Sequence, residues 1–268
     1  MELSETVLTH AVVAPSARLR RFVRRFEIIE TFSERVHTLL PETSAIACFR
    51  LDGVALMHGA SSSSALPSAI VSGVQDRTRS VTHLPGSHLL LTVFTEAGAA
   101  AFLREPLDQL FNRTLPMDDF LRRSRLDEVR EQLMEAGENA GRVEVVERFL
   151  LGRLGSEASD ARPDPVTEAV AAQIRKRHGV VRMEELARGM DLSLSALERR
   201  FRRRVGTSPR KFASIVRMRH VLRLRKAGGS LTEIAHRAGY CDQSHFIKDF
   251  KSFTGLAPES FFRQTSFC

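Results

Sequence analysis

The sequence has few cysteines and no long apolar run, and each shortage excludes a class of protein. Its 268 residues include three cysteines, Cys48, Cys241 and Cys268, which are odd in number and far apart. A disulfide framework is therefore not expected, and no cysteine–histidine cluster has the spacing of a zinc site. No apolar run approaches the ~20 residues that span a bilayer, and residues 1–5 lack the basic start of a signal peptide. We therefore expect a cytoplasmic protein that has no membrane partner.

The charge of the chain is unevenly distributed along the sequence. The formal net charge is +8. Residues 166–268 hold 21 Lys and Arg against 9 Asp and Glu, whereas residues 1–165 hold 19 against 23. A basic C-terminal part beside a mildly acidic N-terminal part predicts that a polyanion binds to the C-terminal part. Charge alone leaves open the alternative that the arginine-rich helix faces are only solvated.

Composition also indicates where the chain divides. The segment from Gly155 to Pro165 is small and polar and contains two prolines, which disfavours both helix and strand. We therefore expect a first domain over residues 1–155, a linker over residues 156–165 and a second domain over residues 166–268. The length of the chain and its apolar content of 43% can supply a core for each of two domains.

The first domain is predicted to be a sheet followed by helices, which makes the fold class of the chain α+β. Up to about residue 95, short apolar runs are bounded by Gly, Pro and Ser, as in a small β-barrel or sandwich. The low-complexity segment Ser61–Ser64 is expected to be a loop. The expected strands are Phe26–Thr31, Ala45–Leu51, Ala69–Val74 and His88–Phe94.

From Ala97 to Leu154 the apolar spacing becomes helical, and Gly137–Gly141 separates two expected helices. Their apolar faces are marked by Leu126, Val129 and Leu133 and by Val143, Val146, Leu150 and Leu154. Two arrangements remain open. The helices either pair across the two-fold axis of a dimer or pack against the barrel of their own chain. In the first case the buried residues would include Leu126, Val129, Val146 or Leu150.

The second domain is predicted to be all helix, and it contains the same short pattern twice. The copies run from Leu186 to Phe201 and from Ile234 to Phe250. Each reads as a helix, a turn that contains glycine, a capping Ser193 or Asp242, and a second helix. This is the layout of a DNA-reading helix-turn-helix, so two copies predict a protein that reads two stretches of duplex DNA. The expected core residues of the two copies are Leu186, Ala187, Leu197, Phe201, Ile234, Ala235, Phe246 and Phe250.

A long helix is predicted to connect the two copies. It starts at Pro209, where a missing N–H costs nothing, and it ends near Lys226 before a pair of glycines. Ser230 and Glu233 then have the spacing of a capping box. A helix of roughly 17 residues is about 25 Å long, and successive major grooves on one face of B-DNA are ~34 Å apart. Such a spacer would place the two recognition helices in adjacent major grooves.

The polar face of the first recognition helix supplies candidate base contacts. Ser195, Glu198 and Arg199 fall on one helical face, opposite Leu197 and Phe201. Arg199 suits guanine, because it can donate two hydrogen bonds, and Glu198 suits the amino group of cytosine. An alternative remains open for Glu198, namely a surface ion pair with Arg202.

In the second recognition helix Gln243, Ser244 and Lys248 occupy the matching face. Gln243 suits adenine, Ser244 a base edge or a phosphate, and Lys248 a phosphate. His245 could approach the backbone of DNA, although a packed or solvated imidazole is the alternative, and Cys241 in the turn is expected to be structural. Further positive charge for phosphates comes from Arg200, Arg202, Arg203, Arg204, Arg210, Lys211 and Lys251.

From Met183 through Arg263 the sequence resembles the AraC-type (AraC/XylS) family of bacterial transcription regulators. The resemblance implies a DNA-binding domain, with duplex DNA and RNA polymerase as partners and an activator as one form of regulator. Its first signature is carried by Leu186-Ala187, Ser193, Leu197 to Phe201, Gly206, Pro209 and Phe212. Its second is carried by Ile234-Ala235, Gly239-Tyr240, Asp242 to Ser244, Phe246, Lys248, Phe250-Lys251, Gly255 and Pro258.

The first domain is similar, more weakly, to the N-terminal regions attached to some of these regulators. The resemblance implies a cupin-like barrel with trailing helices, which senses a small-molecule effector or forms a homodimer. It rests on Pro15, Leu19, Arg20, Phe22 and Val23, on Leu40-Pro41, and on Thr92 to Phe94 with Gly98, Ala99 and Phe102.

Two other classes of protein compete with a regulator. An enzyme of the cupin or DNA-repair type, fused to a DNA-binding module, would need a metal cluster or a reactive cysteine. His58, His83 and His88 contain no tight His-x-His pair, and Cys48 lies in an expected buried strand. We therefore expect no enzyme, no metal and no cofactor. An architectural protein without sequence preference is disfavoured, because the polar residues of the two recognition helices differ, as two unlike subsites require.

Overall fold

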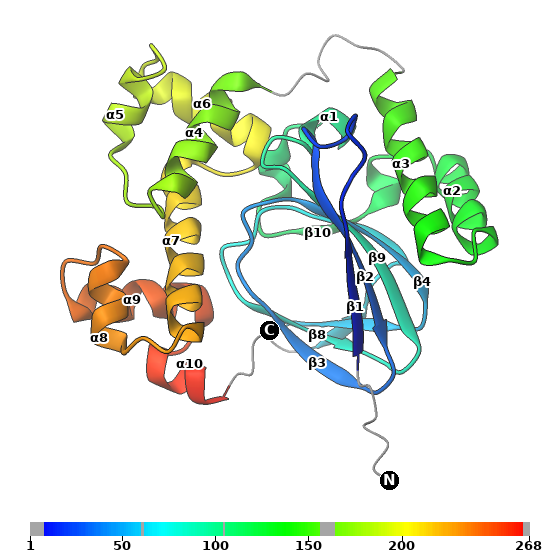
Figure 1. Ribbon diagram of the computed structural model, residues 1–268, viewed down its shortest axis with the longest axis horizontal. Coiled ribbons are helices and arrows are strands. Elements are labelled where there is room, and N and C mark those ends of the chain that lie inside the picture. The colour runs from blue at the N-terminus through cyan, green and yellow to red at the C-terminus, as the bar shows by residue number, and fades with distance from the viewer. Residues whose placement is uncertain (1–7, 60–61, 104, 156–163, 265–268) are drawn as a thin grey trace.

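The structure is a computed structural model that describes residues 8–59, 62–103, 105–155 and 164–264. Sheets form the N-terminal region and helices the C-terminal region, as expected for the α+β class (Figure 1). Within these residues no helix is both long and apolar enough to cross a membrane.

Two antiparallel sheets make up the N-terminal region. The larger has the order β1-β2-β9-β4-β7-β10 and comprises Leu8–Val13, Val23–Thr31, Ser87–Phe94, Ile46–Asp52, Ala69–Ser72 and Thr114–Pro116. The smaller has the order β3-β8-β5-β6 and comprises Arg35–Leu39, Arg79–His83, Ala55–His58 and Ser63–Ala65. Among the described residues, strand pairing does not join the two sheets into a closed barrel. The expected β-barrel is therefore open.

The four expected strands are all present, as β2, β4, β7 and β9. The prediction for Ser61–Ser64 was wrong in part, because Ser63 begins the edge strand β6, whose hydrogen-bonding groups pair with β5. The strands that the sequence did not indicate are short, or carry polar or exposed residues. Strand β1, for example, is exposed over most of its length, and strand β3 reads Arg-Val-His-Thr-Leu.

Helices cover one face of the larger sheet. After α1 (Ala100–Leu103) and the short 3-10 helices η1 (Leu107–Leu110) and η2 (Met117–Asp119), the chain forms α2 (Arg123–Glu135) and α3 (Asn139–Gly155). The ring of Phe149 on α3 contacts that of Phe49 on β4, with centroids 6.4 Å apart.

The apolar faces of α2 and α3 are therefore buried against the sheet of their own chain. Leu126, Val129, Val146 and Leu150 are each at most 4% exposed within one core with β2, β4, β7 and β9. This packing excludes the alternative in which these four side chains pair across a dimer axis.

The C-terminal region consists of helices from α4 to α10. Their bounds are α4 Pro165–Lys176, α5 Met183–Arg188, α6 Leu194–Val205, α7 Pro209–Lys226, α8 Leu231–Arg237, α9 Gln243–Thr254 and α10 Pro258–Gln264. The connecting helix α7 has the predicted bounds, and Ser208 caps it. The predicted capping box of Ser230 and Glu233 is also present, at the start of α8. Helix α7 stands between the α4–α6 unit and the α8–α10 unit (Figure 1).

The predicted linker falls largely outside the described residues, which exclude 156–163. At its C-terminal end Asp164 caps α4 and Pro165 is already helical, because proline suits the first turn of a helix. The division of the chain into domains at this linker stays a prediction.

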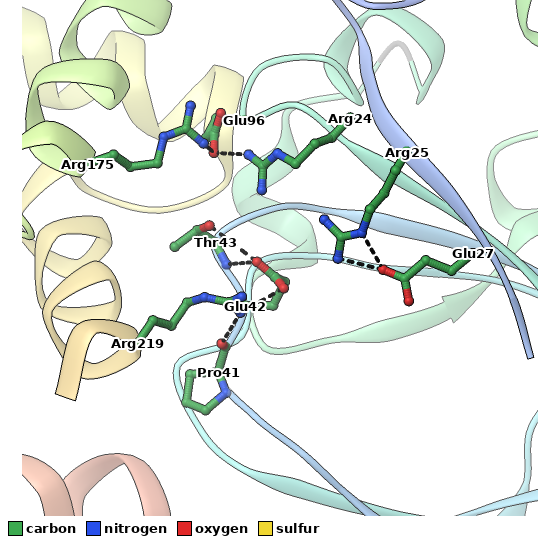
Figure 2. A network of polar contacts seen from close by, with 9 residues as sticks. All are labelled: Arg24, Arg25, Glu27, Pro41, Glu42, Thr43, Glu96, Arg175 and Arg219. Atoms are coloured by element: carbon green, nitrogen blue, oxygen red, sulfur yellow. Dashed lines mark hydrogen bonds and ion pairs between the residues drawn. The ribbon is translucent and has the colours of Figure 1, made fainter. Parts of the chain in front are cut away.

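The two regions share an extensive contact surface. Val74 of the N-terminal region is buried in the core of the C-terminal region, and Leu40 and Phe111 pack against the same core. Polar contacts add to it (Figure 2). Glu96 binds both Arg24 and Arg175, and Glu42 accepts a hydrogen bond of 2.8 Å from Arg219.

Candidate DNA-binding site

The two helix-turn-helix units repeat each other in backbone geometry. Asp191 in the first turn and Gly239 in the second both adopt a left-handed conformation, with φ of +53° and +74°. In each unit the following residue donates its N–H to the carbonyl of an alanine in the last turn of the first helix. The distances are 3.0 Å from Leu192 to Ala187 and 3.0 Å from Tyr240 to Ala235. The repeat seen in the sequence is therefore a repeat of structure.

Each recognition helix starts at the predicted cap. The side chain of Ser193 accepts from the N–H of Ala196 at 3.2 Å, and that of Asp242 accepts from the N–H of His245 at 2.7 Å. Both helices end at a left-handed glycine, Gly206 or Gly255. Caps and glycines thus fix α6 and α9 at the same length.

A buried face holds each recognition helix in its unit. All eight residues that the sequence assigned to this core are at most 6% exposed, because small alanines and large apolar side chains interdigitate between the helices. These residues are Leu186, Ala187, Leu197, Phe201, Ile234, Ala235, Phe246 and Phe250.

Counted from the caps, the exposed face repeats as well. The positions two, six and nine residues after Ser193 are Ser195, Arg199 and Arg202, and those after Asp242 are Ser244, Lys248 and Lys251. All six side chains are exposed. Residues at this spacing share one helical face, so each unit presents a hydroxyl and two cations in the same order. Gln243, which the sequence placed on the matching face, has no counterpart at these three positions, and the second turn is one residue longer than the first.

The remaining candidates differ between the two units. Glu198 is half-buried, and within the described part of the chain it forms no ion pair with Arg202. Gln243 is exposed in the first turn of α9. His245 is exposed too, and its ring meets the edge of Tyr240, with centroids 5.3 Å apart. Glu198, Gln243 and His245 are thus the candidate positions at which the two units differ.

Two of the basic residues expected to meet phosphates are already paired. Arg200 donates two hydrogen bonds of 2.6 Å to Asp164, the cap of α4. The Nζ of Lys211 lies 2.9 Å from a carboxylate oxygen of Asp76 and 5.7 Å from the centroid of Phe253. These contacts hold α6 and α7 in the fold and make Arg200 and Lys211 less available to phosphates.

The pKa of Asp164 reflects the strength of its ion pair with Arg200. Burial raises the pKa of its carboxyl, but hydrogen bonds from Arg200, Thr167 and the N–H of Val166 outweigh burial. The pKa therefore lies below the ordinary value. The carboxylate stays ionised at neutral pH and joins α4 to the recognition helix α6.

A polar contact that sequence reasoning missed supports the second turn. The hydroxyl of Tyr240 donates to Asp249 at 2.8 Å, and Arg217 lies over the tyrosine ring, 4.9 Å from its centroid. Burial, followed by the charge of Asp249 and this hydrogen bond, raises the pKa of Tyr240. The hydrogen bond between Tyr240 and Asp249 joins the second turn to α9, one helical turn beyond His245. In the sequence, only the dipeptide Gly239-Tyr240 pointed to this contact.

The three histidines considered as metal ligands, His58, His83 and His88, each contact different residues. His58 bonds to Ser63 and Thr82, at 2.8 and 2.7 Å, and the ring of His83 contacts that of His37. His88 lies 3.4 Å from Glu30. No cluster suited to a metal occurs among the residues that the structure describes.

Cys48, the cysteine considered for a DNA-repair enzyme, has surroundings that disfavour a thiolate. Cys48 and Cys241 are unpaired, and Cys268 lies outside the described residues. Burial raises the pKa of the Cys48 thiol to about 12, only partly opposed by the charge of Arg50. Its thiolate is therefore scarce at neutral pH, which weakens the alternative of a DNA-repair enzyme.

The chain is similar to known proteins mainly in its C-terminal region. Residues 186–264 match a family described as helix-turn-helix domain. The HTH-type transcriptional activator RhaS of Escherichia coli O139:H28 is 34% identical over 81 residues, which are 29% of this chain and 28% of RhaS. The RhaS of Pectobacterium carotovorum is 32% identical over 76 residues, or 28% and 27% of the two chains. The chain thus spans less than a third of the curated relatives it matches.

Among solved structures, ToxT from Vibrio cholerae O395 aligns with 97% of this chain and 99% of its own, at a TM-score of 0.46 and 16% identity. Residues 186–264 are therefore a helix-turn-helix domain, and through this domain the chain is similar to AraC-type regulators such as RhaS.

Proposed function

We propose that this protein is a sequence-specific DNA-binding transcription regulator that inserts α6 and α9 into adjacent major grooves. The observation that carries the proposal is an exposed face that repeats on both recognition helices. On each helix this face presents a serine followed by two cations, while the opposite face is buried and the helix is capped in the same way. Its cations suit phosphates and guanine, and its hydroxyls suit base edges or phosphates.

The spacing of the two units supports adjacent grooves. Helix α7 comprises 18 residues, which make a rod about 27 Å long. The widths of the units add to that length, and the sum is comparable with the ~34 Å between successive major grooves. One face of DNA would then meet both recognition helices.

The two helices would read different subsites. Ser195, Glu198, Arg199 and Arg202 form the proposed contacts of the first. Those of the second are Gln243, Ser244, His245, Lys248 and Lys251. The N-terminal region would control the regulator, through a small molecule or through dimerisation, and RNA polymerase would be a further partner. The protein would act without enzymatic chemistry.

Selection of the full-length protein against a random pool of duplex DNA tests this function. The proposal predicts an enriched motif in two parts. Binding without an enriched motif would instead indicate an architectural protein. The variant Leu197→Asp is the control, because a buried aspartate prevents the first recognition helix from packing and so reveals any binding of DNA outside the helix-turn-helix domain.

A further inference from the structure

A cleft lies between the two regions of the chain, beside α7. Its volume is about 420 Å³, which is in the range of small-molecule sites. Arg24 on β2 and Leu40 and Thr43 after β3 line it from the N-terminal region, and side chains of α4 and α7 line the opposite wall. None of the residues proposed to contact DNA lines this cleft.

The lining of the cleft is strongly cationic. No Asp or Glu is among its lining residues. Figure 2 shows the nearest carboxylates, of which Glu96 binds two of the lining arginines and Glu42 binds a third. Two further cations on α7 form no ion pair within the described residues. The five lining cations are Arg24, Arg175, Arg219, Arg223 and Lys226.

Beside these cations the cleft offers an apolar wall, formed by Leu40, Val216 and Leu222. His178 also lines it and stacks on His220, with ring centroids 4.0 Å apart. Burial, followed by the positive surroundings, lowers the pKa of His220 to about 4. The His220 imidazole is therefore neutral at neutral pH and adds no charge beside the cleft.

We propose that the cleft binds a small organic anion, whose charged group faces Arg223 and Lys226 and whose apolar body lies against Leu40, Val216 and Leu222. Guanidinium groups hold carboxylate, sulfonate and phosphate through paired hydrogen bonds. The ligand also needs an apolar body, because an inorganic anion would leave the apolar side chains of the wall exposed to water. The anion would be the effector of the proposed regulator, and only this role rests on the proposed function.

The position of the cleft gives the ligand a means of control. The anion would contact α7 and, through Leu40, the N-terminal region. It would also compete with Glu42 for Arg219, whose bond of 2.8 Å joins the regions. A ligand that contacts both regions binds one of their arrangements better than others and shifts the population toward it.

Two dyes test the proposal with the full-length protein in the absence of DNA. Anilinonaphthalene sulfonate is an organic anion with an apolar body, and phenylnaphthylamine is the same body without the sulfonate. The affinity of each dye is measured by fluorescence titration. The test variant is Arg223→Gln with Lys226→Gln, and the control is Arg122→Gln with Arg123→Gln, which removes the same charge from exposed positions on the N-terminal region.

The proposal expects one sulfonate dye per chain and weaker binding of the neutral dye. The test variant should lower the affinity for the sulfonate roughly tenfold, the effect of two partly exposed ion pairs, and the control should leave it unchanged. Equal affinity for both dyes, or an unchanged affinity in the test variant, would overturn the proposal. In a separate titration with duplex DNA, a test variant that loses affinity for DNA but keeps its affinity for the sulfonate would overturn it too, since the cations would then be phosphate contacts. The dye titrations contain no DNA, so their outcome does not depend on that of the selection experiment. Failure of the ligand proposal can therefore be distinguished from failure of the proposed function.

Discussion

Arg199 and Arg200 are neighbours in the sequence and have different surroundings in the structure. Arg199 is exposed on the repeated face of α6, whereas Arg200 points back to Asp164 and donates two hydrogen bonds to it. Both belong to one arginine-rich run, and the sequence could not separate them, because the position of Asp164 depends on how α4 packs. Helical spacing correctly placed Leu197 and Phe201 in the core, since periodicity is a local property.

The variant Arg199→Ala tests the assignment of a base contact. We expect a loss of about 1–3 kcal/mol in binding to the selected motif and relaxed preference at one base pair. Fluorescence anisotropy with selected and random duplexes measures both effects. Arg182→Ala, which removes an exposed arginine from outside the repeated face, is the matched control. Equal losses on selected and random DNA would show that Arg199 contacts only phosphate.

The ion pair of Asp164 predicts a stability that depends on pH. Since its pKa is lowered in the folded state, the pair stabilises the fold above the ordinary Asp pKa of about 3.9. This contribution is lost as the pH falls through the lowered value. Asp164→Asn should lower the free energy of unfolding by roughly 1–3 kcal/mol at pH 7, and the difference should shrink below pH ~4. Urea unfolding across pH measures it, with Glu184→Gln as the control.

At the scale of elements, the sequence predicted those strands whose apolar residues pack under α2 and α3. Phe26, Phe49, Val71 and Leu90 are examples, each at most 2% exposed. Strands β3 and β8 were not predicted, because His37, Arg79 and His83 interrupt their apolar pattern, and they form by pairing, β3 with β8 and β8 also with β5. Tertiary pairing, rather than local pattern, forms these strands.

The two turns of the repeat allow a paired test of backbone geometry. A Cβ on Gly239, at φ +74°, would lie 2.8 Å from Cγ2 of Val180, whereas Asp191 adopts the matching conformation with a side chain. Gly239→Ala should therefore lower the free energy of unfolding by about 1–2 kcal/mol, and Asp191→Gly should change it by less than about 1 kcal/mol. Denaturant titration measures both values. A neutral Gly239→Ala would contradict the strained turn.

At the scale of the whole molecule, the N-terminal region touches the C-terminal ends of both recognition helices. A Cβ on Gly206, which ends α6, would lie 2.8 Å from the carbonyl oxygen of Leu107. Near the end of α9, the N–H of Thr78 donates to the carbonyl of Phe253 at 2.9 Å. The N-terminal region thus contacts both recognition helices, which are also joined by α7. Local sequence patterns could not indicate these contacts, because they join segments 99 and 175 residues apart.

The exposed cations predict how binding depends on salt. If six to ten of them meet phosphates, the affinity for duplex DNA should fall by about 10³–10⁵ between 50 and 200 mM salt. Lys251→Ala should reduce the slope by roughly one ion and leave base preference unchanged. Titrations at a series of salt concentrations measure the slope. A shallow slope would mean that the basic C-terminal region is not the DNA-binding surface.

The central claim is that α6 and α9 read two successive major grooves. Hydroxyl-radical footprinting of the selected DNA, with the wild-type protein and with Arg199→Ala and Lys248→Ala, tests it most directly. The account predicts two protected patches on one face of the duplex, about 10 base pairs apart, of which each variant weakens a different one. A single patch, or two patches that both variants weaken alike, would contradict it.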